Sequence, residues 1–392
     1  MRNILIILDN EYKPDPRVKK HIDCLLNDLN FEVHLICTES NQKENDDNHP
    51  NLHIYRMMNQ RQLFQYYKYH FEKELEFIED IIRENNIRNI LANDHLCLEI
   101  SCKLKRKMNH LKIIYDAHEF ISGWPYYQYE KNWFNYFKGA MVHIFFSYKE
   151  KSNLKKVNSL MTVSEGLREE YLKLFPSLNT SVIRNIPPSF KENRSSNVDY
   201  RKKLGLNQNQ KILIHSGNLY YKDFILDFLL NNIAQFKEDW RILFLIKNSD
   251  RHRITNHKLY QQVQDKILFH DFVPYNELKN FLSIGTAGLI LNYKPEWKSH
   301  WHSLPNRIFD YIHAGLPIIS TKQPEFEKIV NSYNIGVTFD ISKNNNIMKI
   351  SFQKIIENAF NFKKKLSSAQ KEMVWSKEKE RLIEIIKNVN HD

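Results

Sequence analysis

Short apolar runs alternate with amphipathic repeats along the first half of the chain. Residues 4–8 form an apolar run typical of a buried strand, and residues 18–29 then place apolar side chains at helical spacing. Further strands are expected at residues 31–37, 87–92, 113–115, 161–163 and 182–183. This alternation predicts a parallel sheet covered by helices on both faces. We assign it to a first domain, residues 1–185.

A second alternating series follows a segment rich in proline and polar residues, which begins at Asn185 and is typical of a linker. Its strands are expected at residues 211–215, 241–246, 267–269, 287–291 and 317–320. The predicted fold class is therefore α/β, with two tandem doubly wound, Rossmann-like domains (1–185 and 186–375) that face a cleft. Ligands of such sheets bind beyond the carboxyl ends of the strands, so residues that follow strands are candidates for a site. Residues 376–392 predict an amphipathic terminal helix that packs back on the first domain.

The glycine content excludes two large classes of nucleotide-binding protein. The chain has 9 glycines among 392 residues, and they fit neither a Gly-x-Gly-x-x-Gly fingerprint nor a Walker-type loop. Most dinucleotide-binding dehydrogenases and the P-loop kinases and ATPases are thereby excluded. The 4 cysteines form no Cys-x-x-Cys pair and have no companion histidine spacing for zinc. We therefore expect reduced thiols and no metal site.

No segment of the sequence has the length and apolar character of an export signal or a membrane span. The first apolar run is shorter than the 7 to 15 residues of a signal-peptide core. No apolar run approaches the 18 residues of a transmembrane helix. We expect a cytoplasmic protein.

The net charge of +11 and the pI near 9.2 permit an anionic partner, such as a membrane face or a phosphorylated substrate. The basic residues are scattered, however, as a bias of an AT-rich genome would also produce. The densest basic run follows a stretch rich in Trp, Tyr and Phe, which predicts a peripheral contact with the inner membrane surface. That run contains Lys149, Lys151, Lys155 and Lys156. No recognition motif accompanies the charge, so no nucleic-acid partner is expected.

Residues 303–317 have the start and stop signals of a short helix. Ser303 is suited to the N-cap, Pro305 to the first turn, and Gly315 followed by Pro317 to the end. Free backbone amides at such a helix start, with the helix dipole behind them, form an anion site suited to a pyrophosphate.

Two charged side chains follow in this helix. Arg307 can add a guanidinium fork for phosphate. Asp310, one turn further on, can accept two hydrogen bonds from a vicinal diol such as that of ribose. The same spacing also fits an ordinary capped helix with a solvated aspartate, so spacing alone leaves both interpretations open.

Several motifs occur in the order and spacing of one enzyme family. They are Asp15-Pro16-Arg17-Val18, Ile114-Tyr115-Asp116-Ala117-His118-Glu119, Thr162-Val163-Ser164-Glu165, Val182-Ile183-Arg184-Asn185, His215-Ser216-Gly217-Asn218-Leu219 with Lys222, Phe269-His270-Asp271-Phe272-Val273, and residues 305–317. Together they resemble the retaining glycosyltransferases of the GT-B fold, close to glycosyltransferase family 4, over nearly the whole chain.

The resemblance implies that the second domain holds a nucleoside-diphosphate sugar, with no metal and no cofactor. Lys222 and Arg307 would stabilise the departing diphosphate, and Asp310 would hold the ribose. The other donor-binding residues implied are Gly217, Asn218, Phe272, Val273, Ser303, Leu304, Pro305 and Asn306.

The first domain would then take the acceptor, a glycan or a lipid-linked glycan of polysaccharide or glycoconjugate biosynthesis. His118 would orient hydroxyl groups close to the transferred sugar, although a structural hydrogen bond is the alternative interpretation of this His-Glu pair. Asp15, Arg17 and Glu119 are the other acceptor-side residues implied.

The chain departs from the family pattern at the donor phosphate loop and before the donor helix. Asn218 stands where relatives carry arginine, and Asp223 replaces the glycine that follows the lysine. Asp310 and His302 replace a pair of glutamates eight positions apart. Two alternatives therefore stay open beside a hexosyltransferase: a catalytically silent glycosyltransferase-like partner subunit, and a GT-B sugar-nucleotide epimerase.

Overall fold

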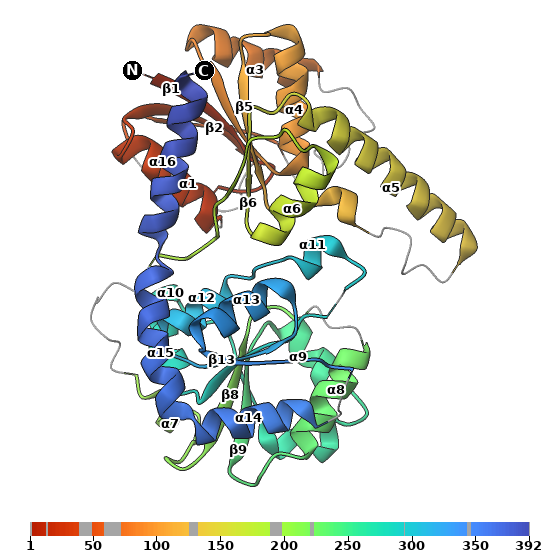
Figure 1. Cartoon of the computed structure of the whole chain (residues 1–392), viewed down its shortest axis with the longest axis vertical. Coiled ribbons are helices and arrows are strands. Elements are labelled where there is room, and N and C mark those ends of the chain that lie inside the picture. The colour runs from red at the N-terminus through yellow and green to blue at the C-terminus, as the bar shows by residue number, and fades with distance from the viewer. Residues whose placement is uncertain are drawn as a thin grey trace. The chain divides into compact units, whose positions relative to one another are not determined.

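The computed structural model describes residues 2–12, 15–38, 49–58, 72–124, 132–188, 198–219, 223–293, 295–342 and 346–391. The chain divides into two compact units (Figure 1). The N-terminal unit comprises Met1–Asn185, Glu296–Ser299 and Ser376–Asp392, and the C-terminal unit comprises Ile186–Pro295 and His300–Trp375. Each unit has its own parallel sheet, which confirms the predicted fold class of two α/β domains.

The sheet of the N-terminal unit has seven described strands in the order β3-β2-β1-β4-β5-β6-β7, and all neighbours are parallel. They are β1 (Arg2–Ile7), β2 (Phe31–Thr38), β3 (Leu52–Met58), β4 (Asn89–Asn93), β5 (Lys112–Ala117), β6 (Ser159–Thr162) and β7 (Thr180–Val182). The central strands are nearly continuous apolar runs because helices cover both faces of the sheet. The carboxyl ends of β1, β4 and β5 lie side by side, which brings together the residues that follow them.

Helices of the N-terminal unit surround this sheet. They are α1 (Pro16–Asn27), α3 (Glu72–Glu84), α4 (Asp94–Lys107), α5 (Trp133–Leu154), α6 (Glu165–Leu174) and α16 (Trp375–His391), with the 3-10 turn η1 (Ile121–Gly123). Figure 1 shows α16 beside α1, and Lys379 of α16 forms a 2.8 Å ion pair with Asp28 at the end of α1. The terminal helix thus completes the N-terminal unit.

The sheet of the C-terminal unit has six described strands in the order β10-β9-β8-β11-β12-β13, again all parallel. They are β8 (Lys211–Ser216), β9 (Trp240–Leu245), β10 (Ile267–His270), β11 (Ala287–Ile290), β12 (Ile318–Thr321) and β13 (Gly336–Phe339). The helices are α7 (Tyr200–Lys203), α8 (Asp223–Ala234), α9 (Asn248–Thr255), α10 (Tyr275–Ser283), α11 (Lys298–Trp301), which crosses between the two units, α12 (Arg307–His313), α13 (Pro324–Tyr333), α14 (Ile347–Glu357) and α15 (Ala359–Glu372), with the 3-10 turns η2 (Tyr260–Gln262) and η3 (Gln264–Lys266).

Successive residues of the central strands enter two separate apolar cores. Leu213 and Phe244 pack with α8 and α14, whereas Ile214 and Leu245 pack with α10, α12 and α13. Side chains of a strand point alternately to opposite faces, so this unit is covered on both faces. Helix α12 is therefore anchored directly against the strand β8 that precedes the candidate phosphate loop.

Two strands lie outside the positions that the sequence pattern predicted, β3 and β13. Both lie at an end of the described strand order, and most of their residues are only half-buried. A strand at such a position does not need a continuous apolar run, and the sequence pattern therefore did not indicate either one. The 4 cysteines are buried and unbridged. Among the described helices, every one falls short of the length and apolar character that a membrane span requires.

Candidate functional site

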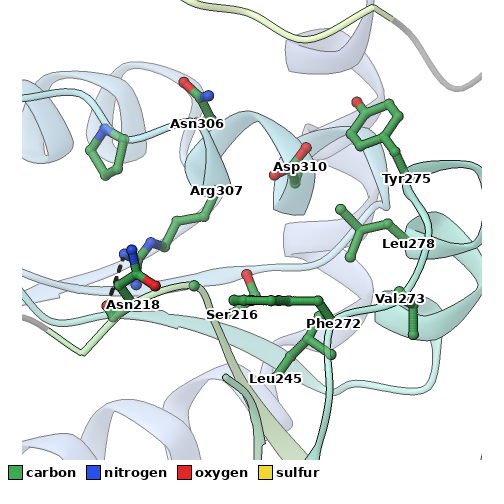
Figure 2. Close-up of a pocket in the computed structure, with 12 residues that line it drawn as sticks. Ser216, Asn218, Leu245, Phe272, Val273, Tyr275, Leu278, Asn306, Arg307 and Asp310 are labelled. Atoms are coloured by element: carbon green, nitrogen blue, oxygen red, sulfur yellow. Dashed lines mark hydrogen bonds between the residues drawn. The ribbon is translucent and has the colours of Figure 1, made fainter. Parts of the chain in front are cut away.

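A pocket of about 550 Å³ opens at the carboxyl edge of the C-terminal sheet, where the loops after β8 and β10 meet the start of α12. Eight of the residues predicted for the donor site line it, together with four residues that were not predicted to bind the donor. The lining residues are Ser216, Gly217, Asn218, Leu245, Phe272, Val273, Tyr275, Leu278, Pro305, Asn306, Arg307 and Asp310 (Figure 2). All of them belong to the C-terminal unit.

The Arg307 guanidinium lies over the turn that follows β8. Its Nη1 donates to Nε2 of His215 over 3.2 Å, and its Nη2 donates to the carbonyl of Asn218 over 3.4 Å. Gly217 between them has φ +93°, and a Cβ there would lie 3.3 Å from Nη2 of Arg307. Burial and the neighbouring guanidinium hold the pKa of His215 well below its usual value, so its imidazole is neutral and can accept this bond. Glycine therefore lets the cation sit directly on the backbone.

Tyr311 fixes the position of α12 relative to β8. Its hydroxyl accepts from the backbone amide of Ser216 over 3.0 Å and lies 3.2 Å from the carbonyl of Ile214. The ring packs against Gly288, where a Cβ would come within 2.4 Å of it. Because Tyr311 is fully buried, it determines where the neighbouring polar residues of α12 can reach.

Asp310 presents a carboxylate to the pocket without a hydrogen-bonding partner for its buried Oδ1 among the described residues. Burial raises the pKa of Asp310 to about 7, although Arg307 opposes this shift. Burial, and the nearby Asp310 carboxylate, also raise the pKa of Tyr275. Figure 2 shows Asp310, Tyr275 and Leu278 along one side of the pocket, Arg307 and Asn218 on the other, and the Phe272 ring between them.

The loop that leads into α12 differs from the prediction. Ser303 is not the N-cap: its hydroxyl donates to the carbonyl of His300 over 2.8 Å and accepts from Asn292. The helix begins a turn later at Arg307, after Asn306, whose side chain forms no cap. Leu304 is buried in the core, so it and Ser303 hold the loop and do not line the pocket. The amides of Ile308, Phe309 and Asp310 in the first turn of α12 donate to the carbonyls of Pro305 and Asn306, so these three amides do not form the anion site of free donors that the sequence predicted.

Lys222, predicted to bind the diphosphate, lies outside the described residues. The residues predicted on the acceptor side all belong to the N-terminal unit and gather at the carboxyl ends of β1, β4 and β5.

Arg17 and Asp15 take structural positions there. Arg17 is buried and forms a bidentate pair with Asp116, with N–O distances of 2.8 and 2.6 Å, and its Nη1 donates to the carbonyl of Ile183 over 2.7 Å. Asp15 caps α1 by accepting from the amides of Arg17 and Val18. Both side chains are thus engaged in the fold.

His118 lies between two carboxylates and is partly exposed. Its Nδ1 is 3.2 Å from Asp94 and its Nε2 is 3.3 Å from Asp116, while its backbone amide donates to Asp94 over 3.1 Å. Burial lowers the pKa of His118, but Asp94 and Asp116 outweigh it and raise this pKa well above its usual value. Asp94 has φ +63°, an uncommon conformation that Asp tolerates and that directs its carboxylate to His118.

Glu119 lies beside this group, and its carboxyl is buried enough to raise its pKa to about 7, with the nearby Asp94 adding to the shift. Asp9 after β1 has a pKa of about 7 for the same two reasons. An imidazolium fixed between carboxylates, beside two carboxyls that titrate near neutrality, can orient and exchange protons with hydroxyl groups.

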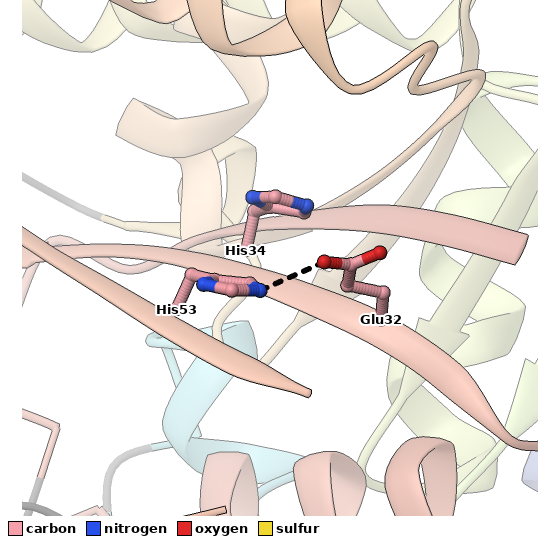
Figure 3. Close-up of side chains that lie close together, drawn as sticks. All are labelled: Glu32, His34 and His53. Carbon is pink, nitrogen blue, oxygen red and sulfur yellow. Dashed lines mark hydrogen bonds and ion pairs between the residues drawn. The ribbon is translucent and has the colours of Figure 1, made fainter. Parts of the chain in front are cut away.

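Sequence reasoning missed one cluster of possible metal ligands, Glu32, His34 and His53 on β2 and β3 (Figure 3). Glu32 and His34 are two residues apart on one strand, which was a readable signal, but His53 lies on the strand that the pattern did not predict. Tyr275, which faces Asp310, was missed because it opens a helix and does not end a strand.

The chain was compared with known families and structures. Residues 197–373 match the family described as glycosyl transferases group 1. Sucrose-phosphate synthase from Thermosynechococcus elongatus is similar with a TM-score of 0.75 and 13% identity over 100% of both chains. A glycosyltransferase from Rickettsia africae has a TM-score of 0.73 and 14% identity over 99% of this chain and 98% of that one. HepE of Anabaena, solved with UDP-glucose, has a TM-score of 0.68 and 13% identity over 99% and 100%. No curated protein sequence matches the chain.

The family match covers the part of the chain that contains the pocket, and the structural similarity extends over both units. The C-terminal unit is thus similar to the family described as glycosyl transferases group 1, and the chain has the GT-B fold.

Proposed function

We propose that this chain transfers a hexose-type sugar from a nucleoside-diphosphate sugar to a glycan or lipid-linked glycan, with retention at the anomeric carbon. The observation that carries the proposal is that one pocket contains the guanidinium of Arg307 and the carboxylate of Asp310, whose buried Oδ1 has no hydrogen-bonding partner in the described part of the chain. One group suits a diol and the other suits a phosphate, and a nucleoside diphosphate has both.

Asp310 suits ribose for an energetic reason. A buried acceptor without a partner costs free energy, and a vicinal diol can donate two hydrogen bonds to one carboxylate. A phosphate at the same place would meet a like charge. The apolar surfaces of Phe272, Val273 and Leu278 beside it are suited to the flat face of a base.

The Arg307 guanidinium suits the diphosphate. Negative charge grows on this group as the bond to the sugar breaks, and donors already held in place stabilise that charge without reorganising. His215 accepts a hydrogen bond from the guanidinium, and Gly217 leaves room for the guanidinium next to the backbone. We infer from the sequence that Lys222 adds a second cation, so that the reaction proceeds without a metal or cofactor. The complexes of Anabaena HepE with UDP and of the E. coli trehalose-6-phosphate protein with UDP-2-fluoro glucose favour a uridine donor.

The acceptor would meet the N-terminal unit. We assign the orientation of its hydroxyl group to His118, with Glu119 close by. A second pocket of about 470 Å³ in this unit lies among η1, α5 and α6 and combines apolar side chains with lysines. Its lining includes Phe120, Ile144, Tyr148, Lys151 and Lys173. Glu170 of the same lining pairs with Lys173, over 2.6 Å. Apolar walls together with Lys151 are suited to a phosphate-linked lipid, which favours a lipid-linked glycan as acceptor.

Binding of UDP-, GDP- and ADP-sugars by calorimetry, followed by mass spectrometry of the products, tests this function. We expect one donor to bind. Its sugar should be transferred when an acceptor is present, and the donor should be hydrolysed when none is present. Asp310→Ala should weaken donor binding, whereas Asp239→Ala, an exposed aspartate before β9, should not. Binding of none of these donors would refute the proposal. Binding without turnover would favour a silent partner subunit, and isomerised donor without acceptor would favour an epimerase.

The lipid-linked acceptor also requires the protein to reach a membrane, and α5 supplies a surface for this. Figure 1 shows α5 extending away from the rest of the N-terminal unit. Its exposed large apolar side chains are Trp133, Phe134, Tyr136, Phe137, Met141, Ile144, Phe145 and Tyr148. The one acidic residue of α5, Glu150, is buried, so the charge that α5 exposes is basic. Aromatic and basic residues on one helix are typical of binding in the plane of an anionic lipid surface.

Flotation with lipid vesicles tests this part of the proposal. The chain should bind vesicles containing anionic lipid, and the double variant Phe134→Ser, Phe137→Ser should lose at least tenfold in binding. Phe360→Ser is the control, because Phe360 is 81% exposed, more than Phe134 at 62% and Phe137 at 59%, but lies in the C-terminal unit. Equal binding by both variants would contradict the assignment, as would a dimer in solution that Phe134→Ser, Phe137→Ser converts to a monomer.

A further inference from the structure

Three possible metal ligands lie on one face of the N-terminal sheet, on strands β2 and β3. The two strands are parallel, and His34 is the register partner of His53. Glu32 precedes His34 by two residues, so both side chains leave the strand on the same face. The imidazole rings are stacked, with centroids 4.9 Å apart. The pairing of the strands therefore fixes where these groups meet.

The distances among the groups suit a small divalent cation. Glu32 Oε1 is 2.8 Å from His53 Nε2, and one ligand atom from each residue lies within 4.8 Å of the other two. Zinc binds nitrogen and oxygen at about 2.0–2.2 Å, which places tetrahedral ligands roughly 3.4 Å apart. Glu32 and His53 can make this adjustment because their side chains are 30% and 39% exposed. Their exposure also gives an ion access from solvent.

His34 provides a second observation that points to a ligand. This histidine is 1% exposed, and its Nε2 is buried without a hydrogen-bonding partner among the described residues. A buried nitrogen left unpaired costs free energy. Its other nitrogen, Nδ1, lies 3.3 Å from the hydroxyl of Tyr55. When Nδ1 carries the hydrogen and donates a hydrogen bond to the Tyr55 hydroxyl, the lone pair of Nε2 can bind a metal. Histidine ligands of metals are commonly oriented by such a second hydrogen bond.

Figure 3 shows that a ring nitrogen of each histidine lies on the side of the Glu32 carboxylate. We propose that Glu32, His34 and His53 bind one zinc ion, with water as the fourth ligand and Tyr55 as the group that orients His34. Two imidazoles and a carboxylate form a donor set that zinc prefers. Binding replaces the hydrogen bond between His53 and Glu32 by a bond from each of them to the ion. The site joins β3, the last strand in the described order of this sheet, to β2.

Metal binding by the full chain tests this proposal. The purified chain, stripped with a chelator, is titrated with Co²⁺ and then with Zn²⁺, and the visible absorption of tetrahedral Co²⁺ and the calorimetric stoichiometry are recorded. We expect one ion per chain, displacement of Co²⁺ by Zn²⁺, and a higher unfolding temperature with Zn²⁺. His53→Gln and Glu32→Gln should each weaken binding at least tenfold. Tyr55→Phe, which keeps the ring, should weaken it about 10- to 100-fold.

His257→Gln is the matched control. His257 forms a similar 3.2 Å pair with Asp227, but the described residues add no third ligand there. Its Zn²⁺ binding should equal that of the wild type. Equal loss in His257→Gln and His53→Gln, or a stoichiometry near zero, would overturn the proposal and leave Glu32 and His53 as an ordinary ion pair. The outcome is independent of sugar transfer, because Asp310→Ala should bind Zn²⁺ normally whatever its donor affinity.

Discussion

Replacing Asp310 by asparagine tests the donor site most directly, because it changes one charge and keeps the size of the side chain. In the wild type the pKa of Asp310 is about 7. Ribose needs the ionised form to accept both diol protons, so binding should strengthen as the pH rises through 7. With one proton involved, about a tenth of the carboxyl is ionised at pH 6 and about nine tenths at pH 8, so the donor Kd should be roughly tenfold weaker at pH 6.

Asp310→Asn should remove this pH dependence and weaken binding at pH 8. Hydrogen bonds to a charged group are worth about 1.5–3 kcal/mol, which corresponds to roughly 10- to 100-fold in Kd. Calorimetry with an intact nucleotide sugar is the assay, because its doubly esterified diphosphate has no titration near pH 6. A donor analogue without the ribose 2′-hydroxyl should bind the wild type and Asp310→Asn more nearly alike. An unchanged pH profile in Asp310→Asn would refute the assignment.

The same substitution should change stability in the opposite direction to affinity. Since burial raises the pKa of Asp310, the folded protein holds this proton more tightly than the unfolded chain does between about pH 4 and 7. The ionised carboxylate thus costs stability above pH 7 and costs nothing below pH 4. Asp310→Asn should therefore unfold at higher urea concentration than the wild type at pH 8, and at a similar concentration at pH 4.

Three further substitutions separate the roles of the two units. Arg17→Met removes the bidentate guanidinium from buried Asp116 and leaves His118 beside this carboxylate, so urea unfolding should show a loss of about 3–5 kcal/mol in the N-terminal unit; a loss below 1 kcal/mol would contradict the buried pair. Tyr311→Phe removes the acceptor of the Ser216 amide and should lower the free energy of unfolding by about 1–3 kcal/mol, and it should weaken donor binding. Unchanged donor affinity would exclude a role of Tyr311 in placing α12. His118→Gln should lower kcat about 100-fold or more while donor Kd stays unchanged; an equal effect on donor binding would remove His118 from the acceptor side.

The elements with strong local signals were predictable. Buried parallel strands such as β1, β8 and β11 are continuous apolar runs, and the segment from Pro305 to Gly315 contains its own helix signals. The motifs of residues 215–218 and 305–310 therefore pointed to one end of one sheet. They did so because the carboxyl ends of parallel strands must meet at the same edge.

The rest depended on contacts distant in sequence. Ser303 has the chemistry of an N-cap, but Asn292 and the carbonyl of His300 occupy its hydroxyl, and no local pattern encodes Asn292. Likewise Arg17 belongs to a family motif on the acceptor side, yet its partners Asp116 and Ile183 are distant and bury it. A short range of sequence indicates which residue types are present, whereas distant partners determine which of their atoms remain available.

Helix α12 illustrates how the apolar pattern itself positions the chemistry. Ile308, Tyr311 and Ile312 are buried and share one face, which fixes the rotation of the helix about its axis. Arg307 and Asp310, three residues apart, then necessarily share the adjacent face that borders the pocket. Their opposite charges do not neutralise each other in a direct ion pair, because Arg307 is bound by His215 and Asn218. A cation and a carboxylate are thereby kept one helical turn apart, as the proposed binding of a diphosphate and its ribose requires.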